Sequence, residues 1–196
     1  LIEIFGILIS FIGIFLFISF ITYSPDDPNF IFPENTKIKN LLGIQGSYIS
    51  DLFFQSVGLI AYLIPITYIF SGINIFKKKE IFLIIENSFF IILYLIFGSI
   101  FFSFFYKNAF TLYINGNGGF VGNYLSNLFS NNVNSSYENI IYYALILLIS
   151  LFFLISINFN VKNFISSLNK IYIFLFKKKD KSYTNKNEII NEYIPQ

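Results

Sequence analysis

The sequence contains no cysteine, histidine, tryptophan, methionine or arginine, and only 12% of its 196 residues are charged. Without cysteine there are no disulfides and no thiolate metal sites. Without histidine, the usual zinc ligand and the usual base at neutral pH are also missing. A soluble domain normally carries about 25% charged residues, so the low charge argues against a water-soluble fold. Because the chain has no methionine and ends in polar sequence, we expect it to be a segment of a longer protein.

Apolar residues are abundant instead: hydrophobic types make up 55% of the chain, and 28 residues are phenylalanine. One small soluble core cannot bury this much apolar surface, which indicates that lipid is the solvent. Four uncharged apolar runs approach or exceed the roughly 18 residues that cross a hydrocarbon core. In lipid each backbone amide must find its partner within its own segment, so these runs are predicted to be helices. The predicted fold is therefore an all-α membrane protein with spans at about 4–22, 52–76, 87–106 and 139–158.

The lysines predict the orientation of these spans. Ten of the 13 lie in the loop after the second span or in the C-terminal tail, and three lie in the other two loops. Lysine is enriched on the cytoplasmic side of membrane proteins. We therefore predict that both termini are cytoplasmic and that the first and third loops lie outside. Glu86, at the start of the third span, is expected at the cytoplasmic interface.

A proline-bracketed turn follows the first span, with the sequence Ser24-Pro25-Asp26-Asp27-Pro28. The two prolines predict a rigid turn that ends the helix. Paired carboxylates also occur in acid–base and metal sites, but no histidine or third acid accompanies this pair. We therefore expect a solvated turn in which the aspartates cap local backbone groups.

An internal repeat links the two outer loops. Residues 43–53 and 119–129 lie 76 positions apart and are identical at six of eleven positions. This predicts two helical hairpins, spans one–two and three–four, related by a pseudo-two-fold axis along the membrane normal; chance similarity in a low-complexity chain is the alternative. Each copy has helical periodicity, which predicts a short amphipathic helix at the outer membrane boundary. The matching residues that we single out are Gly43, Gly46, Tyr48, Gly119, Gly122 and Tyr124.

Small and polar residues recur on one face of the second span, with alternating spacings of four and three. Such faces pack helices together in membranes, because close backbone approach and hydrogen bonds replace the missing hydrophobic drive. We predict a kink at Pro65. A substrate path lined by Gln55 and Thr67 is the alternative. The predicted packing residues, including two from the first span, are Gly6, Ser10, Gln55, Gly58, Tyr62, Pro65 and Gly72.

The tail after the fourth span combines an apolar helical face with a run of lysines. Residues 161–179 are predicted to form an interfacial juxtamembrane helix. Its basic cluster, which would be attracted to anionic lipid, is Lys177, Lys178, Lys179 and Lys181. Residues 180–196 are expected to begin a disordered cytoplasmic linker.

Four stretches together resemble the N-terminal four-helix membrane domain of the FtsK/SpoIIIE family of DNA translocases. Residues 23–28 are similar to the family's Tyr-Ser-Pro-x-Asp-Pro motif, and residues 58–65 are similar to its Gly-x-x-Ala-Tyr-x-x-Pro span. Residues 40–52 and 118–125 complete the match, whose order and spacing agree over about residues 5–160.

The resemblance implies a membrane anchor and septum-localising assembly domain of a cell-division DNA translocase in the bacterial inner membrane. Its partners would be the lipid bilayer and the membrane proteins of the divisome. ATP, magnesium, DNA and assembly into a hexamer would belong to a RecA-like ATPase motor that this chain lacks. The segment itself is expected to have no catalytic, cofactor or metal site.

Two other functions remain to be weighed. A small multi-pass transporter or channel would need polar or ionisable groups near the middle of the bilayer, and only Gln55, Thr67 and Glu86 come close. An intramembrane enzyme is disfavoured, because the chain has no histidine or cysteine and no predicted buried pair of acids.

Overall fold

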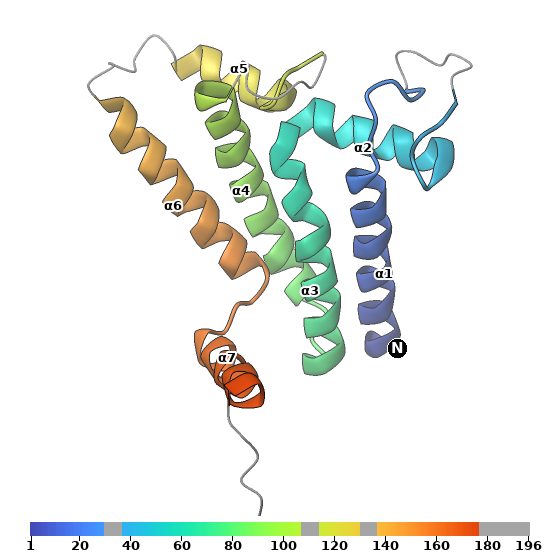
Figure 1. Ribbon diagram of the computed structural model, residues 1–196, viewed down its shortest axis with the longest axis vertical. Helices are drawn as coiled ribbons and strands as arrows, with labels where there is room; N and C mark the ends of the chain where they lie inside the picture. The colour runs from blue at the N-terminus through green and yellow to red at the C-terminus, as the bar shows by residue number, and fades with distance from the viewer. Residues whose placement is uncertain (30–36, 107–113, 130–136, 177–196) are drawn as a thin grey trace, which may run out of the picture. The chain divides into compact units, whose positions relative to one another are not determined.

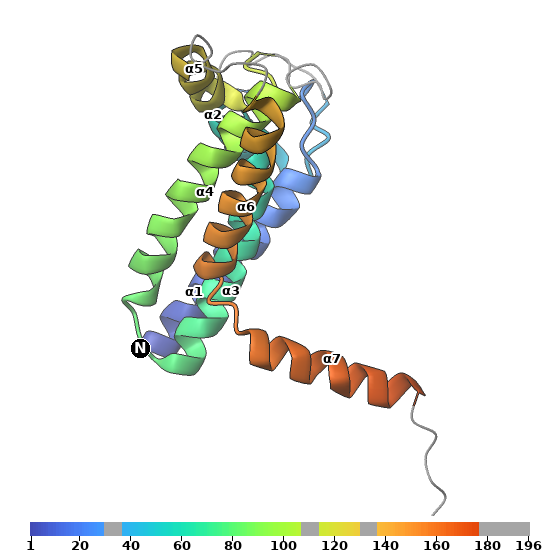
Figure 2. The same ribbon diagram turned by 90° about the vertical axis from the view of Figure 1, so that its left-hand side faces the viewer.

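The computed structural model describes residues 1–29, 37–106, 114–129 and 137–176, which form helices and no strand. Residues 1–159 form one compact unit, and residues 160–196 form a second unit. The helices of the first unit are α1 (Ile2–Ile21), α2 (Gly43–Val57), the 3₁₀ helix η1 (Gly58–Tyr62), α3 (Leu63–Lys78), α4 (Leu83–Phe105), α5 (Gly119–Phe129) and α6 (Glu138–Ser156). The second unit contains α7 (Val161–Phe176), which Figure 2 shows as one uninterrupted helix.

The prediction of an all-α fold with four membrane-crossing segments is confirmed. Among the described residues, the segments long and apolar enough to cross a bilayer are α1, the stretch Gly43–Lys78, α4 and α6. Three of them differ from the predicted spans by only a few residues at each end. Glu86, in the first turn of α4, is exposed.

Within the first unit, the long helices α1, α3, α4 and α6 lie side by side in that order (Figure 1). Helices α2 and α5 lie across one end of this row in both views (Figures 1 and 2). We call this end the cap: α2, η1 and α5, together with residues 22–29, 37–42 and 114–118. The opposite end holds the start of α1 and the end of α3.

The polarity of the unit is inverted relative to a soluble protein. Many fully buried side chains are polar, including Ser19, Thr67 and Asn87. Large apolar side chains such as Phe11 and Tyr143 are exposed. A small apolar core lies where α1, α2, η1, α3 and α4 meet, and it consists of Leu16, Phe20, Phe54, Ile60, Ala61, Ile64, Ile91 and Tyr94. This inversion is expected when lipid, and not water, surrounds the helices.

The prediction of one continuous second span with a kink at Pro65 is wrong. The chain turns sharply at Gly58, whose φ of 76° and ψ of −153° end α2, and η1 then leads into α3. Residues 52–57 therefore belong to a helix that lies across the cap. Pro65 is the third residue of α3, where its missing N–H removes no intrahelical hydrogen bond. The chain reverses at a glycine because this backbone conformation is accessible almost only to glycine.

A helix, α7, begins where the juxtamembrane helix is predicted and ends at Phe176. Its position at the membrane surface stays a prediction. The basic cluster Lys177, Lys178, Lys179 and Lys181 and the predicted linker 180–196 lie outside the described residues.

Candidate functional site

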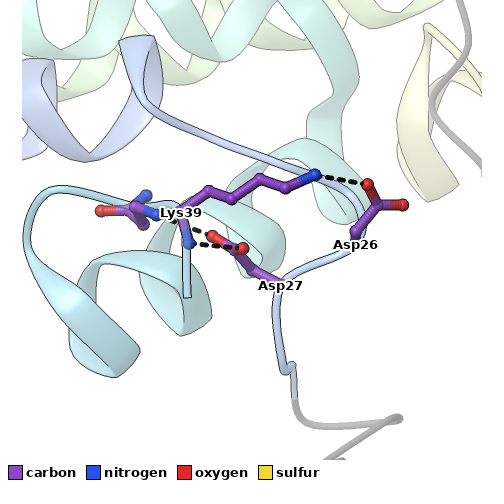
Figure 3. A network of polar contacts seen from close by, with 4 residues as sticks. Asp26, Asp27 and Lys39 are labelled. Carbon is purple, nitrogen blue, oxygen red and sulfur yellow. Dashed lines mark hydrogen bonds and ion pairs between the residues drawn. The ribbon is translucent and has the colours of Figure 1, made fainter. Parts of the chain in front are cut away.

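The cap contains several buried polar side chains. The first that joins its segments is the carboxylate of Asp27. The Asp27 oxygens accept the backbone N–H groups of Lys39 at 2.8 Å and Asn40 at 2.9 Å. Asp27 is only 3% exposed, whereas the neighbouring Asp26 is exposed and forms an ion pair with Lys39 at 2.8 Å (Figure 3). The expected solvated turn is therefore wrong for Asp27, which joins two segments of the cap.

A second set of hydrogen bonds fastens α2 to the end of α1. The Ser19 hydroxyl donates to the Gly46 carbonyl at 2.7 Å, and the Asn40 amide donates to the Ser19 carbonyl at 2.9 Å. Ser47 donates to the Pro28 carbonyl at 2.7 Å. A β-carbon on Gly46 would lie 2.2 Å from the Asn40 side chain, so this contact requires glycine.

The third anchor is the junction between Gly58 and the start of α5. The Leu59 N–H donates to the Asn117 carbonyl at 2.9 Å. A β-carbon on Gly58 would lie 2.0 Å from that same oxygen, and one on Gly119 would lie 2.5 Å from the Gly58 nitrogen. Ser99 of α4 donates to the Val57 carbonyl at 2.8 Å. The two cap helices and α4 therefore meet through backbone contacts.

A partly open polar pocket of about 160 Å³ lies between the first loop and α2. Its lining residues are Tyr23, Pro25, Asp26, Asn29, Asp51, Gln55 and Ile114. Asp51 is only 5% exposed; its Oδ1 accepts the Tyr23 hydroxyl at 3.1 Å and the Gln55 amide at 3.4 Å. Burial and the adjacent Asp51 carboxylate raise the pKa of the Tyr23 phenol, so this phenol stays protonated and donates. Among the described residues, no three acidic, histidine or cysteine side chains are grouped as a metal site.

The long helices pack through two different seams. The glycine seam joins α1 to α3 through Gly6, Ser10, Gly13, Ile69 and Gly72. The two backbones are so close that a β-carbon on Gly72 would lie 2.4 Å from the Gly6 carbonyl oxygen. The Ser10 hydroxyl donates to the Ile69 carbonyl at 3.3 Å.

The aromatic seam joins α4 to α6 through Phe90, Phe97, Phe101, Tyr142 and Phe152. Phe152 stacks on Phe90 and on Phe97, with ring centroids 6.2 and 5.7 Å apart. Phe101 lies 5.3 Å from Tyr142 by the same measure.

Polar side chains also link α3, α4 and α6 in the interior. The Thr67 hydroxyl lies 3.2 Å from the Tyr94 hydroxyl and 3.2 Å from the Ser156 hydroxyl. Asn87 donates to Ser71 at 2.7 Å and accepts from Asn158 at 2.8 Å. Each of these buried groups has a partner on another segment, which holds the helices in register.

The structure brings together some of the predicted packing residues and separates others. Gly6, Ser10 and Gly72 meet in the glycine seam. Gln55 and Gly58 lie in the cap, and the break at Gly58 interrupts the predicted continuous stripe. In the predicted outer-loop motifs, Ser24 accepts the Asp27 N–H and closes the turn at 3.1 Å. A β-carbon on Gly122 would lie 2.3 Å from the Ser99 carbonyl. The Tyr48 side chain is half-buried, and Tyr124 is exposed.

Several residues of the cap and interior were not predicted. Asn40, Ser47 and Asn117 are buried in the cap, and Tyr94 is buried in α4. Each of them has a hydrogen-bond partner 11 or more residues away in sequence, beyond the reach of local patterns. Asn40 had a usable signal, because it precedes the Gly43 copy of the repeat within a stretch that resembles the family.

Comparison with known proteins shows which family the chain belongs to. The model of the 4TM region of DNA translocase FtsK/SpoIIIE matches residues 1–167. This chain belongs to that family. It is 30% identical to the DNA translocase FtsK of Rickettsia prowazekii over 177 residues, which cover 87% of the chain and 23% of the relative.

Two shorter matches agree with this assignment. The DNA translocases FtsK of Rickettsia bellii and Rickettsia typhi are 34% and 37% identical over 74 and 68 residues. These matches cover 38% and 35% of the chain, and 10% and 9% of the relatives. No solved structure matches the chain. The chain is thus the membrane domain of an FtsK-like protein and spans less than a quarter of the length of these relatives.

Proposed function

We propose that the chain anchors a cell-division DNA translocase in the bacterial inner membrane and directs it to the division septum. The observation that carries this proposal is the family match over residues 1–167, joined with relatives named DNA translocase. ATP, magnesium and DNA would be bound only by a motor elsewhere in the longer protein, which would also drive assembly into a hexamer. We assign no catalytic residue to this segment.

In this proposal the cap lies outside the cytoplasm and both termini lie inside. Support comes from Lys77, Lys78 and Lys79, which are exposed at the end of α3 opposite the cap, because lysines favour the cytoplasmic side. Further support comes from α5, which buries Gly122 and Ser126 and exposes Phe120, Tyr124 and Leu128. An exposed apolar stripe next to the ends of the spans suits the membrane interface.

The cap is the surface that we propose for divisome membrane proteins. Its anchors at Asp27, Asn40 and Gly58 join segments far apart in sequence, so its outer surface is preorganised for binding. On the cytoplasmic side, the cluster Lys177, Lys178, Lys179 and Lys181 would bind anionic lipid, at about 1 kcal/mol for each lysine near the surface.

A transporter or channel function gains no support from the interior. The buried Thr67, Asn87 and Tyr94 side chains are hydrogen-bonded to other protein groups. Polar groups that hold helices together have such partners, whereas groups on a transport path face a water-filled cavity. The contacts of these three side chains therefore favour a packing role.

The test is a fluorescent fusion to residues 1–196 in dividing cells, and we expect a band at midcell. The matched control is the same fusion with Gly58→Val, which distorts the cap while the apolar spans still insert. We expect the control to remain in the membrane without the midcell band. A uniform membrane signal from the unmutated fusion would contradict septal recruitment.

A further inference from the structure

The pocket beside α2 is lined by Asp51, and only one of the two carboxylate oxygens of Asp51 accepts a hydrogen bond from the described residues. The hydrogen bonds that Tyr23 and Gln55 donate to Asp51 are both accepted by its Oδ1 atom. Its Oδ2 atom forms no hydrogen bond or ion pair in the part of the chain that the structure describes. This oxygen is not among the buried side-chain atoms that lack a partner, so it reaches the open side of the pocket, where a cation can form a charge-assisted hydrogen bond with it.

The neighbouring groups fix the direction in which Asp51 presents this oxygen. Gln55 accepts the Asn115 backbone N–H at 3.2 Å through its side-chain oxygen, which points its amide nitrogen at Asp51. The pKa of Tyr23 is raised, so its hydroxyl keeps donating to the same Oδ1. Lys39 pairs with Asp26 (Figure 3), and the described residues form no ion pair with Asp51.

The size and lining of the pocket indicate which kind of cation would fit it: a lysine ammonium, an arginine guanidinium or a lipid amine. Its volume of about 160 Å³ is close to that of a cavity of about 150 Å³ that holds one benzene molecule. Pro25 and Ile114 supply apolar walls, which suit the alkyl stem of a lysine. A single free oxygen suits a compact ammonium better than the planar fork of arginine. An ethanolamine lipid would also bring its phosphate close to Asp26 and Asp51, where like charges repel.

We propose that this pocket binds the ammonium group of a lysine side chain presented by a partner protein on the same side of the membrane. The ammonium donates to Asp51 Oδ2, and its alkyl stem lies against Pro25 and Ile114. This inference rests on the proposed assembly role, which it deepens by naming the chemistry of the partner.

The chain offers a direct probe, because it contains only three glutamines: Gln45, Gln55 and Gln196. The 196-residue chain, labelled with ¹⁵N-glutamine in phosphatidylcholine nanodiscs, is titrated with Nα-acetyl-lysine methylamide at constant ionic strength. The uncharged control is the norleucine analogue. We expect the side-chain amide signal of Gln55 to shift saturably with the lysine probe only, while that of the exposed Gln45 stays constant. Asp51→Asn should weaken binding by about tenfold or more, since it removes a charge-assisted hydrogen bond, and Glu80→Gln should leave it unchanged.

The other outcomes overturn the inference. An equal response to the norleucine analogue, or to sodium chloride alone, would show that the pocket does not recognise the ammonium group. An equal response to the lysine probe in Asp51→Asn would show that Asp51 does not bind it. No response at all would contradict the proposal outright. A Gln55 shift produced by phosphatidylethanolamine nanodiscs, with loss of lysine binding, would assign the pocket to lipid. If Asp51→Asn also shifts the Gln45 signal, the substitution has changed the structure of the cap and cannot be used. The comparison of the lysine probe with the norleucine analogue on the unmutated chain then tests the proposal by itself. Amine binding without a midcell band would defeat only the septal role.

Discussion

The two halves of the membrane domain, residues 1–79 and 80–159, contain the same order of a long helix, a cap helix and a second long helix, yet their helices pack differently. In the first half, α1 and α3 approach through Gly6, Gly13 and Gly72 until backbone meets backbone. In the second half, α4 and α6 are held apart by rings such as Phe97 and Phe152. Whether a two-fold axis relates the halves stays a prediction.

The contrast shows two solutions to one problem. In lipid, helices gain little from hiding apolar surface, so association depends on van der Waals packing and hydrogen bonds. Glycines bring carbonyls and amides together but leave no room for a β-carbon. Aromatic pairs contribute about 0.5–1.5 kcal/mol each, and a ring can be exchanged for another apolar group of similar volume. The first half should therefore be less tolerant of substitution.

The largest effect is expected at Gly58, where the first half turns from α2 towards α3. Gly58→Ala strains a glycine-only backbone conformation and places a β-carbon 2.0 Å from the Asn117 oxygen. We expect it to lower the free energy of unfolding by about 3 kcal/mol or more, measured by sodium dodecyl sulfate titration in mixed micelles. The control is Gly43→Ala, which also has positive φ but meets nothing within 4 Å. It should cost about 1–2 kcal/mol, and equal losses would show that the clash is unimportant.

A comparison of the seams gives the second prediction. Gly72→Leu should lower the free energy of unfolding by about 2–3 kcal/mol, because overpacking must separate α1 from α3. Phe152→Leu in the aromatic seam removes two ring contacts, with Phe90 and Phe97, and should cost about 1–2 kcal/mol, because leucine keeps much of the apolar volume. The same micelle titration measures both. A larger loss for Phe152→Leu than for Gly72→Leu would reverse our ranking of the two halves.

Removing a hydrogen bond between the two halves should lower the free energy of unfolding by a smaller amount. Tyr94→Phe removes the hydroxyl that Thr67 contacts at 3.2 Å but leaves Thr67 paired with Ser156. Interhelical hydrogen bonds in membranes average about 0.6 kcal/mol, and we expect a loss of that size. Tyr124→Phe on the exposed face of α5 is the control and should change nothing. Loss of several kcal/mol for Tyr94→Phe would mean that the polar interior, and not the seams, holds the halves together.

The smallest effect is expected at the end opposite the cap, where Lys79 pairs with Glu3 at 2.9 Å. Both side chains are well exposed, and exposed ion pairs contribute little. Lys79→Gln should leave the micelle unfolding curve unchanged within error at 0.15 M salt. A clear destabilisation that disappears at high salt would show that charge supports the first half after all.

The fold class, the presence of four membrane-crossing segments and the approximate bounds of three of them could be predicted, because lipid imposes a simple length and composition rule on the sequence. The small residues Gly6, Ser10 and Gly72 could also be singled out, because close packing in membranes selects small side chains. The start of α2 and of α5 coincides with the two predicted amphipathic helices, since helical periodicity is a local property.

The break at Gly58 and the anchor at Asp27 could not be predicted. Residues 52–76 are apolar throughout, so nothing local distinguishes a turn from a continuous span. At the break, the Asn117 carbonyl, 59 residues after Gly58, accepts the Leu59 N–H and leaves no room for a β-carbon on Gly58. Asp27 accepts amides 12 and 13 residues away, whereas local rules predict capping of its own turn. Contacts over such distances appear only once the fold is known.

Cysteine accessibility tests the central claim most directly, because the chain has no natural cysteine. Leu41→Cys places a thiol on the cap at a position 75% exposed, and Glu80→Cys places one at an exposed position at the opposite end. We expect a membrane-impermeant maleimide to label Leu41→Cys in intact spheroplasts and Glu80→Cys only after permeabilisation. The reverse pattern would place the cap in the cytoplasm and contradict the proposed anchor.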